Sequence, residues 1–241
     1  MYEGVHAHPD GERAATVARH ALTAADLGYD GMVVRNHGDA PAEYDAETVR
    51  DEYGVDVVEG MEIRTDDRSQ TASLVNRFRD DYTVLSVHGQ SPSINRLAVE
   101  DVRVDVLAHP MRGDGDVNHV LARAAKENGV RLEFDFGPVL RSSDGTRVRA
   151  IQRLRKLHDM VTQYDAPYVV TAGVASHLDW RTPRDLAAVP ATFGFDPAWV
   201  EEGLREWGRL VARNRDRSGD SFIEPGVRRG RYEEDHRGTR G

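Results

Sequence analysis

The sequence predicts an α/β fold, specifically a TIM-barrel-like (β/α) barrel with about seven parallel strands. Short runs rich in valine alternate with segments whose apolar residues recur at helical spacing. Strand ends return every ~20–40 residues, as in a series of βα units. No G-x-G-x-x-G motif follows the first run, which counts against a dinucleotide-binding sheet. A chain of 241 residues is long enough for one such domain.

The first half of the chain alternates four predicted strands with helices. Gly28 is a typical residue for ending the first helix, and Pro41 is a typical residue for starting the second. The predicted elements are a strand leading to His8, a helix over 12–27, a strand over 31–34, a helix from 41 to 54, a strand over 55–63, a helix over 69–78, a strand over 82–88 and a short helix over 93–99.

The second half continues the pattern through three more strands. The predicted elements are a strand over 104–109, a helix capped by Asp116, a strand over 130–136, a long helix over 144–164, a strand over 167–174, a short helix from Pro183 and a longer helix capped by Asp196. No eighth strand is predicted. From Arg215 the apolar periodicity stops, so we expect a barrel domain over 1–214 and a disordered, arginine-rich tail over 215–241.

Histidines and one glutamate gather at the predicted strand ends. In a parallel barrel these ends share one face, which carries the functional residues. His6 and His8 are two residues apart, so on a strand both would point to the same side. The set is His6, His8, His37, Glu62, His88, His109 and His177. These ligand types could hold Zn²⁺ or Mn²⁺, although a single histidine is more often a hydrogen-bonded structural residue.

The composition favours a cytoplasmic protein with no membrane segment. There is no cysteine and no apolar run near the ~18 residues that a membrane span needs. The formal net charge is -9, and Lys126 and Lys156 are the only lysines, a composition associated with salt-rich cytoplasm. Acidity normally argues against nucleic-acid binding, which depends on neutralising phosphates. In a halophilic background local basic patches matter more than the total charge.

The strand-end motifs resemble those of the polymerase-and-histidinol-phosphatase (PHP) family of metallo-phosphoesterases. His6-Ala7-His8 matches the family's H-x-H, and Glu62, His88 and His109 match its later ligands. Where the family has T-D-H and D-x-H, this chain has Arg35-Asn36-His37 and Ala175-Ser176-His177, so both aspartates are missing. The resemblance implies a PHP-like barrel with too little negative charge for two or three cations.

A second resemblance, in the C-terminal half, is to the archaeal and eukaryotic 30-kDa subunit family of ribonuclease P, known in archaea as protein component 3. It rests on four segments: 116–122, 137–143, 170–176 and 179–186, the last reading Asp-Trp-Arg-Thr-Pro-Arg-Asp-Leu. That family is a PHP-like barrel that mostly lacks the metal residues. The two resemblances are therefore compatible.

The second resemblance implies a subunit of the ribonucleoprotein that removes the 5′ leader from precursor tRNA. Its implied partners are the RNase P RNA, component 2, the other archaeal RNase P proteins and precursor tRNA. Catalysis would belong to the RNA and its Mg²⁺, with no catalytic residue in this chain. The alternative is a PHP-type metal-dependent phosphoesterase, which would use the histidine cluster.

Basic residues near the long helix are candidate RNA contacts. Arg149, Arg153 and Lys156 recur at helical spacing, and we expect them to form an outward basic stripe opposite the apolar face. Guanidinium groups match phosphate geometry. The candidates are Arg141, Arg147, Arg149, Arg153, Lys156, Arg181 and Arg184. A solvated helix face is the alternative interpretation of the same pattern.

Overall fold

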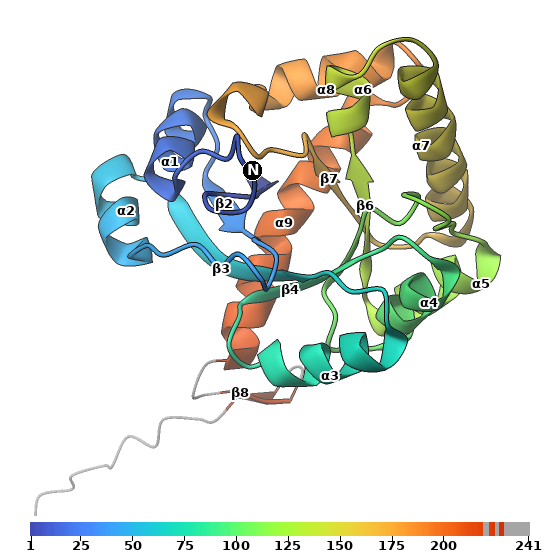
Figure 1. The fold of residues 1–241 in the computed structure, drawn as a ribbon, viewed down its shortest axis with the longest axis horizontal. Helices are drawn as coiled ribbons and strands as arrows, with labels where there is room; N and C mark the ends of the chain where they lie inside the picture. Colours follow the sequence, from blue (N-terminus) through green and yellow to red (C-terminus); the bar gives the residue numbers. More distant parts are fainter. Residues whose placement is uncertain (219–221, 225–226, 229–241) are drawn as a thin grey trace, which may run out of the picture.

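Seven parallel strands form a single sheet in chain order, as the sequence predicts (Figure 1). The computed structural model describes residues 1–218, 222–224 and 227–228. The strands are β1 (Tyr2–Val5), β2 (Gly31–Val34), β3 (Asp56–Ile63), β4 (Val84–His88), β5 (Val106–Ala108), β6 (Arg131–Asp135) and β7 (Tyr168–Thr171). The sheet curls until β1 and β7 meet, where His6 N donates to the Val174 carbonyl at 2.9 Å.

Helices surround the strands on the outside of the barrel (Figure 1). They are α1 (Val17–Asp26), α2 (Ala46–Tyr53), α3 (Arg68–Phe78), α4 (Pro92–Glu100), α5 (His119–Asn128), α6 (Gly137–Arg141), α7 (Asp144–Tyr164), the 3-10 turn η1 (His177–Asp179), α8 (Pro183–Ala191) and α9 (Pro197–Ser218). No helix within the described residues is long and apolar enough to cross a membrane.

Several helix starts differ from the prediction because a side-chain cap begins the helix later. Thr16 caps α1 by accepting from Arg19 N, so 12–15 belong to the loop after β1. Asp45, rather than Pro41, precedes α2, and Asn118, rather than Asp116, caps α5. The five-residue α6 was not predicted. It is too short for helical periodicity to show in the sequence.

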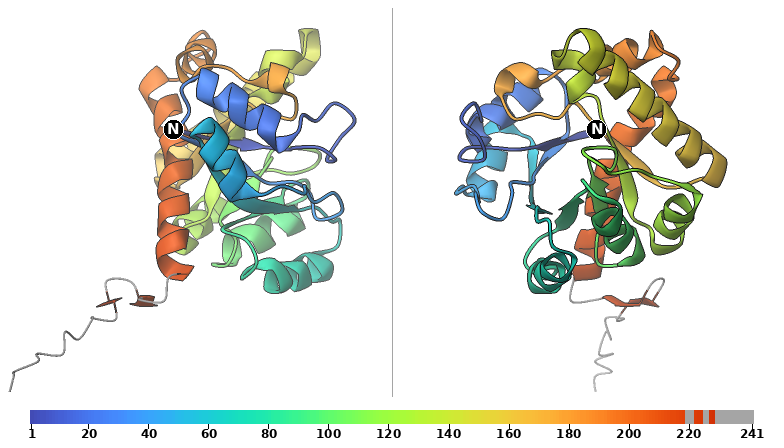
Figure 2. Two further views of the ribbon diagram at one scale, coloured as in Figure 1. Left: turned by 90° about the vertical axis from the view of Figure 1, so that its left-hand side faces the viewer. Right: turned by 45° about the vertical axis from the view of Figure 1, so that its right-hand side comes forward.

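Helix α9 lies across the amino-terminal ends of the strands and closes that end of the barrel (Figure 2, left). Trp207, Leu210 and Val211 of α9 pack against one valine from each of five strands: Val33, Val58, Val84, Val106 and Val169. The helix also pairs with residues at strand starts: Arg215 with Asp56, Arg213 with Asp105, and Glu206 with Arg131. The barrel is thus plugged at one end, and the opposite mouth remains for a site.

The seam between β1 and β7 is joined mainly by side chains. The carboxylate of Glu3 accepts from Ala172 N at 3.1 Å and from the Thr171 hydroxyl, and Trp207 Nε1 donates to the Val170 carbonyl at 2.9 Å. These contacts satisfy backbone groups that a complete strand ladder would otherwise pair. Burial, offset in part by these hydrogen bonds, raises the pKa of Glu3 to about 7.

The predicted tail boundary is wrong at its start. Helix α9 continues to Ser218, and Arg215 lies within it, paired with Asp56 at 2.6 Å. The short strands β8 (Phe222–Glu224) and β9 (Val227–Arg228) pair with each other in antiparallel fashion. The remainder of the predicted tail, 219–221, 225–226 and 229–241, lies outside the described residues.

Candidate functional site

Four imidazoles converge on the carboxylate of Glu62 at the open mouth of the barrel. His88 Nδ1 lies 2.5 Å from Glu62 Oε1, and His37 Nε2 lies 3.5 Å from the same oxygen. His6 Nε2 lies 3.5 Å from Oε2, and His109 Nε2 lies 3.7 Å from Oε1. Neighbouring rings pack face to face or at a tilt, with centroids 4.8–5.6 Å apart. Five of the seven predicted residues therefore form one cluster.

His8 and His177 do not join this cluster. β1 ends at Val5, so the alternation that would align His8 with His6 no longer applies, and His8 is exposed in the following loop. β7 likewise ends at Thr171, three residues before the predicted end, and His177 lies in η1. There it lies near His20, whose pKa it helps burial to lower.

Asp10, which was not predicted, anchors two of the imidazoles from outside. Its carboxylate accepts from His6 Nδ1 at 2.7 Å, and from His37 Nδ1 and the His37 backbone N–H at 2.9 Å each. These contacts hold both rings with Nε2 on the side of Glu62. The hydrogen bonds from both histidines lower the pKa of Asp10 against the effect of burial, so this carboxylate is ionised.

Arg35 forms the floor of the cluster and is fully buried. Nη1 lies 2.8 Å from Glu62 Oε2, and Nη2 forms an ion pair with Glu133 Oε1 at 2.6 Å. The guanidinium carbon also lies 5.6 Å from the centre of the Trp207 ring. Gly4 makes room for it, since a Cβ at that position would lie 2.8 Å from Arg35 Nε. An internal cation thus stands between two buried carboxylates.

This cation lowers the pKa of the carboxylate at the centre of the cluster. Burial alone would raise the pKa of Glu62, but Arg35 and the hydrogen bonds from the imidazoles hold it well below its ordinary value. In His88 burial prevails, and the pKa is lowered despite Glu62. In His37 the hydrogen bonds to Asp10 and Glu62 outweigh burial and raise the pKa. The site therefore combines ionised carboxylates with imidazoles of differing charge.

Two carboxylates of β6 complete the wall of the site beside His109. His109 Nδ1 lies 3.4 Å from Glu133 Oε2 and 3.2 Å from Asp135 Oδ2. Burial would lower the pKa of His109, but Glu133, Asp135 and Glu62 together raise it to about 9. Without a bound cation His109 is therefore protonated at neutral pH and balances charge on this wall, and a metal ion at Nε2 would replace that proton. Its backbone adopts a left-handed conformation, with φ of 49°, which turns the ring toward the acids.

The residues that replace the two PHP-family aspartates have structural tasks. The Asn36 amide accepts from Ala7 N at 2.7 Å and donates to the carbonyls of Ala7 and Ala40 at 2.6 and 2.8 Å. It ties the loops after β1 and β2 together. Ala175, in the place of the second aspartate, has no metal-ligating side chain, and Ser176 caps η1.

The donor set suits a transition-metal ion. Ligand atoms of His6, Glu62 and His109 lie within 4.8 Å of one another, and so do those of His37, Glu62 and His88. The first group joins two imidazoles to one carboxylate, a combination that suits Zn²⁺ or Mn²⁺. Asp10 would orient His6 from behind, as carboxylates often do at metal sites. A second ion would meet the charge of Arg35, which already neutralises Glu62 and Glu133.

Three of the predicted RNA-binding residues form hydrogen bonds or ion pairs within the protein, whereas the other four are exposed. Arg141 donates to the carbonyls of Ala172 and Gly173 at 2.9 and 2.6 Å, which secures β7. Arg181 donates to the carbonyls of Leu178 and Trp180, and Lys156 pairs with Asp116 at 2.7 Å. The exposed group, which forms no ion pair with any residue that the structure describes, comprises Arg147, Arg149, Arg153 and Arg184.

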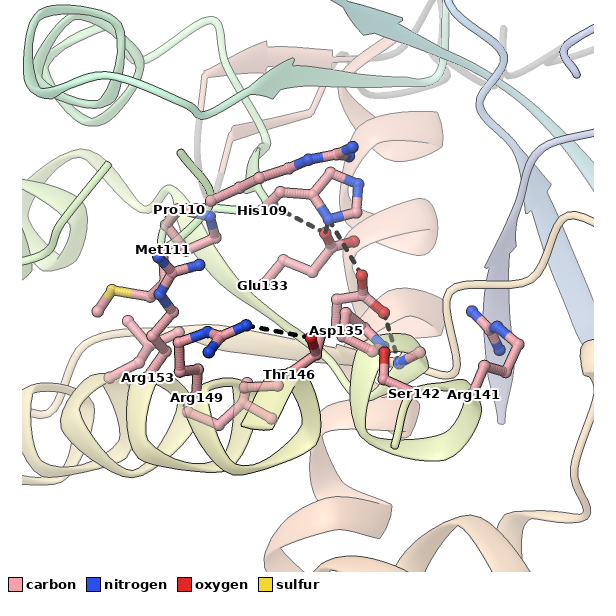
Figure 3. A pocket seen from close by; sticks show the side chains of 16 residues that line it. His109, Pro110, Met111, Glu133, Asp135, Arg141, Ser142, Thr146, Arg149 and Arg153 are labelled. Carbon is pink, nitrogen blue, oxygen red and sulfur yellow. Dashed lines mark hydrogen bonds and ion pairs between the residues drawn. The ribbon is translucent and has the colours of Figure 1, made fainter. Parts of the chain in front are cut away.

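The basic residues predicted to form an outward stripe on α7, namely Arg149, Arg153 and Lys156, are exposed, and two of them also line a cavity. Arg149 and Arg153 border the apolar face of the helix and share a cavity of about 580 Å³ with Leu154 and Leu157 (Figure 3). Arg112, which was not predicted, lines the same cavity from the loop after β5. In the sequence, the one indication that Arg112 lies near the site was its position three residues after His109, at a strand end.

Comparisons with known proteins agree over nearly the whole chain. The model of the RNase P subunit p30 family matches residues 3–219. The Ribonuclease P protein component 3 of Haloarcula marismortui is 61% identical over 228 residues, covering 95% of this chain and 96% of that protein. The protein of the same name from Methanosarcina barkeri is 34% identical, covering 92% of each.

Two solved structures share the fold. A chain of the cryo-EM structure of archaeal ribonuclease P with mature tRNA aligns with a TM-score of 0.76 and 22% identity, covering 93% of this chain and 98% of that one. A histidinol phosphate phosphatase from Lactococcus lactis, complexed with zinc, histidinol and phosphate, aligns with a TM-score of 0.51 and 11% identity, covering 88% and 93%.

Proposed function

The chain belongs to the RNase P subunit p30 family and is a protein subunit of ribonuclease P, and from this premise we propose how it serves that enzyme. The chain binds the RNase P RNA and partner proteins, among them component 2. It thereby supports removal of the 5′ leader from precursor tRNA. The catalytic ions are Mg²⁺ held by the RNA, and this chain contributes no catalytic group.

The buried Arg35 is the structural observation that carries the non-catalytic role. Hydrolysis of a phosphoester by a metal cluster needs cations that are open to the substrate. Here the positive charge between Glu62 and Glu133 is a guanidinium with no exposed surface. Such a group can neither activate water nor exchange ligands. This arrangement favours the role of an RNase P subunit over that of a PHP-type phosphoesterase.

The open arginines support contact with RNA. Arg147, Arg149 and Arg153 lie along α7, and Arg184 lies in the first turn of α8. Because their guanidinium groups have no acidic partner among the described residues, phosphates can bind them without displacing an ion pair. Arg141, Arg181 and Lys156 instead hold the local structure, and they are weaker candidates.

Reconstitution tests the proposed role. RNase P RNA and the other protein subunits are assayed on precursor tRNA at limiting Mg²⁺, with and without this chain. We expect cleavage to rise when the chain is present, and we expect the chain alone to cleave nothing. Equal rates with and without it would overturn the proposal, as would cleavage of precursor tRNA or a generic phosphodiester by the chain alone.

We further propose that the histidine cluster holds one Zn²⁺ or Mn²⁺ ion in a structural role. The His6 and His109 nitrogens and the Glu62 carboxylate would bind it. Elemental analysis of protein purified without chelator is expected to give about one ion per chain, and His6→Ala should lower this occupancy at least tenfold. His8→Ala is the matched control and should keep full occupancy. Metal-free wild-type protein would contradict the proposal, as would equal loss in both variants.

A further inference from the structure

We propose that the cavity between α7 and the loop after β5 binds a single unpaired nucleotide of RNA. The inference rests on the proposed RNA-binding role and specifies its chemistry. A single nucleotide would enter this cavity, whereas an RNA duplex would contact only an exposed surface. This cavity, the α7 groove, is bounded by Pro110, Met111 and Arg112 on one side and by α7 and α6 on the other.

The α7 groove has the size of a nucleotide site and leads to the barrel mouth. Its volume is about 580 Å³, within the range of roughly 300–1,000 Å³ typical of small-molecule sites. Figure 3 shows Arg153 extending from α7 toward Met111 and Arg149 directed to Thr146, while His109, Glu133 and Asp135 line the side of the cavity nearer the barrel. An RNA strand that crosses the mouth could place one residue into this space.

The electrostatics of the α7 groove favour an anion despite its two carboxylates. Glu133 is paired with Arg35 from within the barrel, Asp135 accepts from Gly137 N at 2.7 Å, and both carboxylates contact the His109 ring. Both carboxylates therefore already have partners that a ligand in the groove need not replace. Arg112, Arg149 and Arg153 remain open at the rim. Apart from a hydrogen bond from Arg149 to Thr146, these side chains have no polar partner in the described part of the chain.

The lining of the α7 groove suits a base as well as a phosphate. Apolar groups of Met111, Pro138, Leu154 and Leu157 line the space below the arginines. Unstacked bases bind against apolar groups and guanidinium planes, while the backbone phosphates meet arginine. A base within an RNA duplex is stacked and cannot enter such a hollow. The geometry thus selects single-stranded RNA over double-stranded RNA.

Binding of the full-length chain to fluorescent RNA tests the inference. The probes are a short single-stranded oligonucleotide, the duplex of the same sequence and AMP. We expect the double variant Arg149→Ala/Arg153→Ala to bind the single strand about tenfold or more weakly, because it loses charge-assisted hydrogen bonds to the phosphates. The salt dependence should become shallower by about 0.7 in slope for each phosphate that the variant no longer binds.

Arg205→Ala/Arg209→Ala on α9 is the matched control. These arginines are also exposed but are paired with Glu201, Glu202 and Glu206 at the far end of the barrel. The control should bind the single strand like the wild type, and the melting temperatures of both variants should stay close to that of the wild type. A second test is Met111→Glu, which places a carboxylate in the apolar lining and should weaken binding similarly.

Three results would overturn the α7 groove as a nucleotide site. They are unchanged binding in Arg149→Ala/Arg153→Ala, equal loss in the α9 control, and preference for the duplex over the single strand. Binding of AMP as tight as that of the strand would show a site for free nucleotides instead. The reconstitution assay separates the two proposals: if adding the wild-type chain still raises cleavage, the subunit role stands although the groove inference has failed.

Discussion

Replacing Arg35 by methionine is expected to lower the free energy of unfolding by about 3–5 kcal/mol, the range seen when one partner of a buried ion pair is removed. Methionine fills similar volume, so the loss would come from charge rather than from a cavity. Glu62 and Glu133 would remain buried without the guanidinium that contacts them at 2.8 and 2.6 Å. Urea denaturation followed by circular dichroism gives this free energy.

A rescue variant separates charge from packing in this prediction. Arg35→Met combined with Glu62→Gln and Glu133→Gln removes the cation and both anions while preserving shape. It should recover most of the lost stability, because a buried ion network can often be replaced by neutral groups without penalty. The control Arg64→Met breaks an exposed pair with Asp39 at 3.4 Å and should change stability by less than about 1 kcal/mol.

If Arg35→Met proved as stable as the wild type, Arg35 would not be the cation that balances Glu62 and Glu133. Either protons or a bound metal ion would then have to neutralise these carboxylates. Elemental analysis of the variant would distinguish the two explanations. The experiment therefore also tests the internal charge on which the non-catalytic role of the histidine cluster depends.

The topology of the site was predictable, whereas its charge balance was not. Valine-rich runs revealed the strands, and the shared mouth of a parallel barrel brought together His6, His37, Glu62, His88 and His109. The alternation of polar and apolar residues in Arg131 to Asp135 usually indicates a solvent-facing side. In this barrel the polar side faces inward, to Arg35 and His109, and Leu132 and Phe134 pack against helices.

The errors in the predicted site have two physical causes. Strand alternation holds only within a strand, so His8 and His177 were misplaced when β1 and β7 ended earlier than expected. Long-range pairing leaves no periodic signal in a sequence. The contact of Lys156 with Asp116, 40 residues away, and the bonds from Arg141 to β7 could be recognised only in the folded chain.

Replacing Trp207 by alanine is expected to lower the free energy of unfolding by about 3–5 kcal/mol or more. The substitution leaves a cavity where α9 closes the amino-terminal end of the barrel. The ring is fully buried against the inward valines of the strands. Its N–H also satisfies the Val170 carbonyl at 2.9 Å, and an orphaned buried acceptor costs roughly 1–3 kcal/mol. Differential scanning calorimetry or urea denaturation would measure the loss.

Trp207→Phe and Trp199→Ala test where this effect originates. Phenylalanine keeps most of the apolar volume and loses only the hydrogen bond to Val170, so a smaller loss of about 1–2 kcal/mol is expected. Trp199 is half-buried and stacks on Tyr168 with ring centroids 4.0 Å apart, so its truncation should cost less than that of Trp207.

Equal losses in Trp199→Ala and Trp207→Ala would mean that α9 stabilises the protein only by covering its surface. A clearly larger loss at Trp207 would instead make α9 an integral part of the barrel. Seven strands leave a seam between β1 and β7 that backbone pairing bridges only near Val5 and Val174. Trp207 and Glu3 satisfy backbone groups along that seam, and Trp207 also supports Arg35 from below. The same helix that closes the barrel would then hold in place the internal cation beneath the histidine cluster.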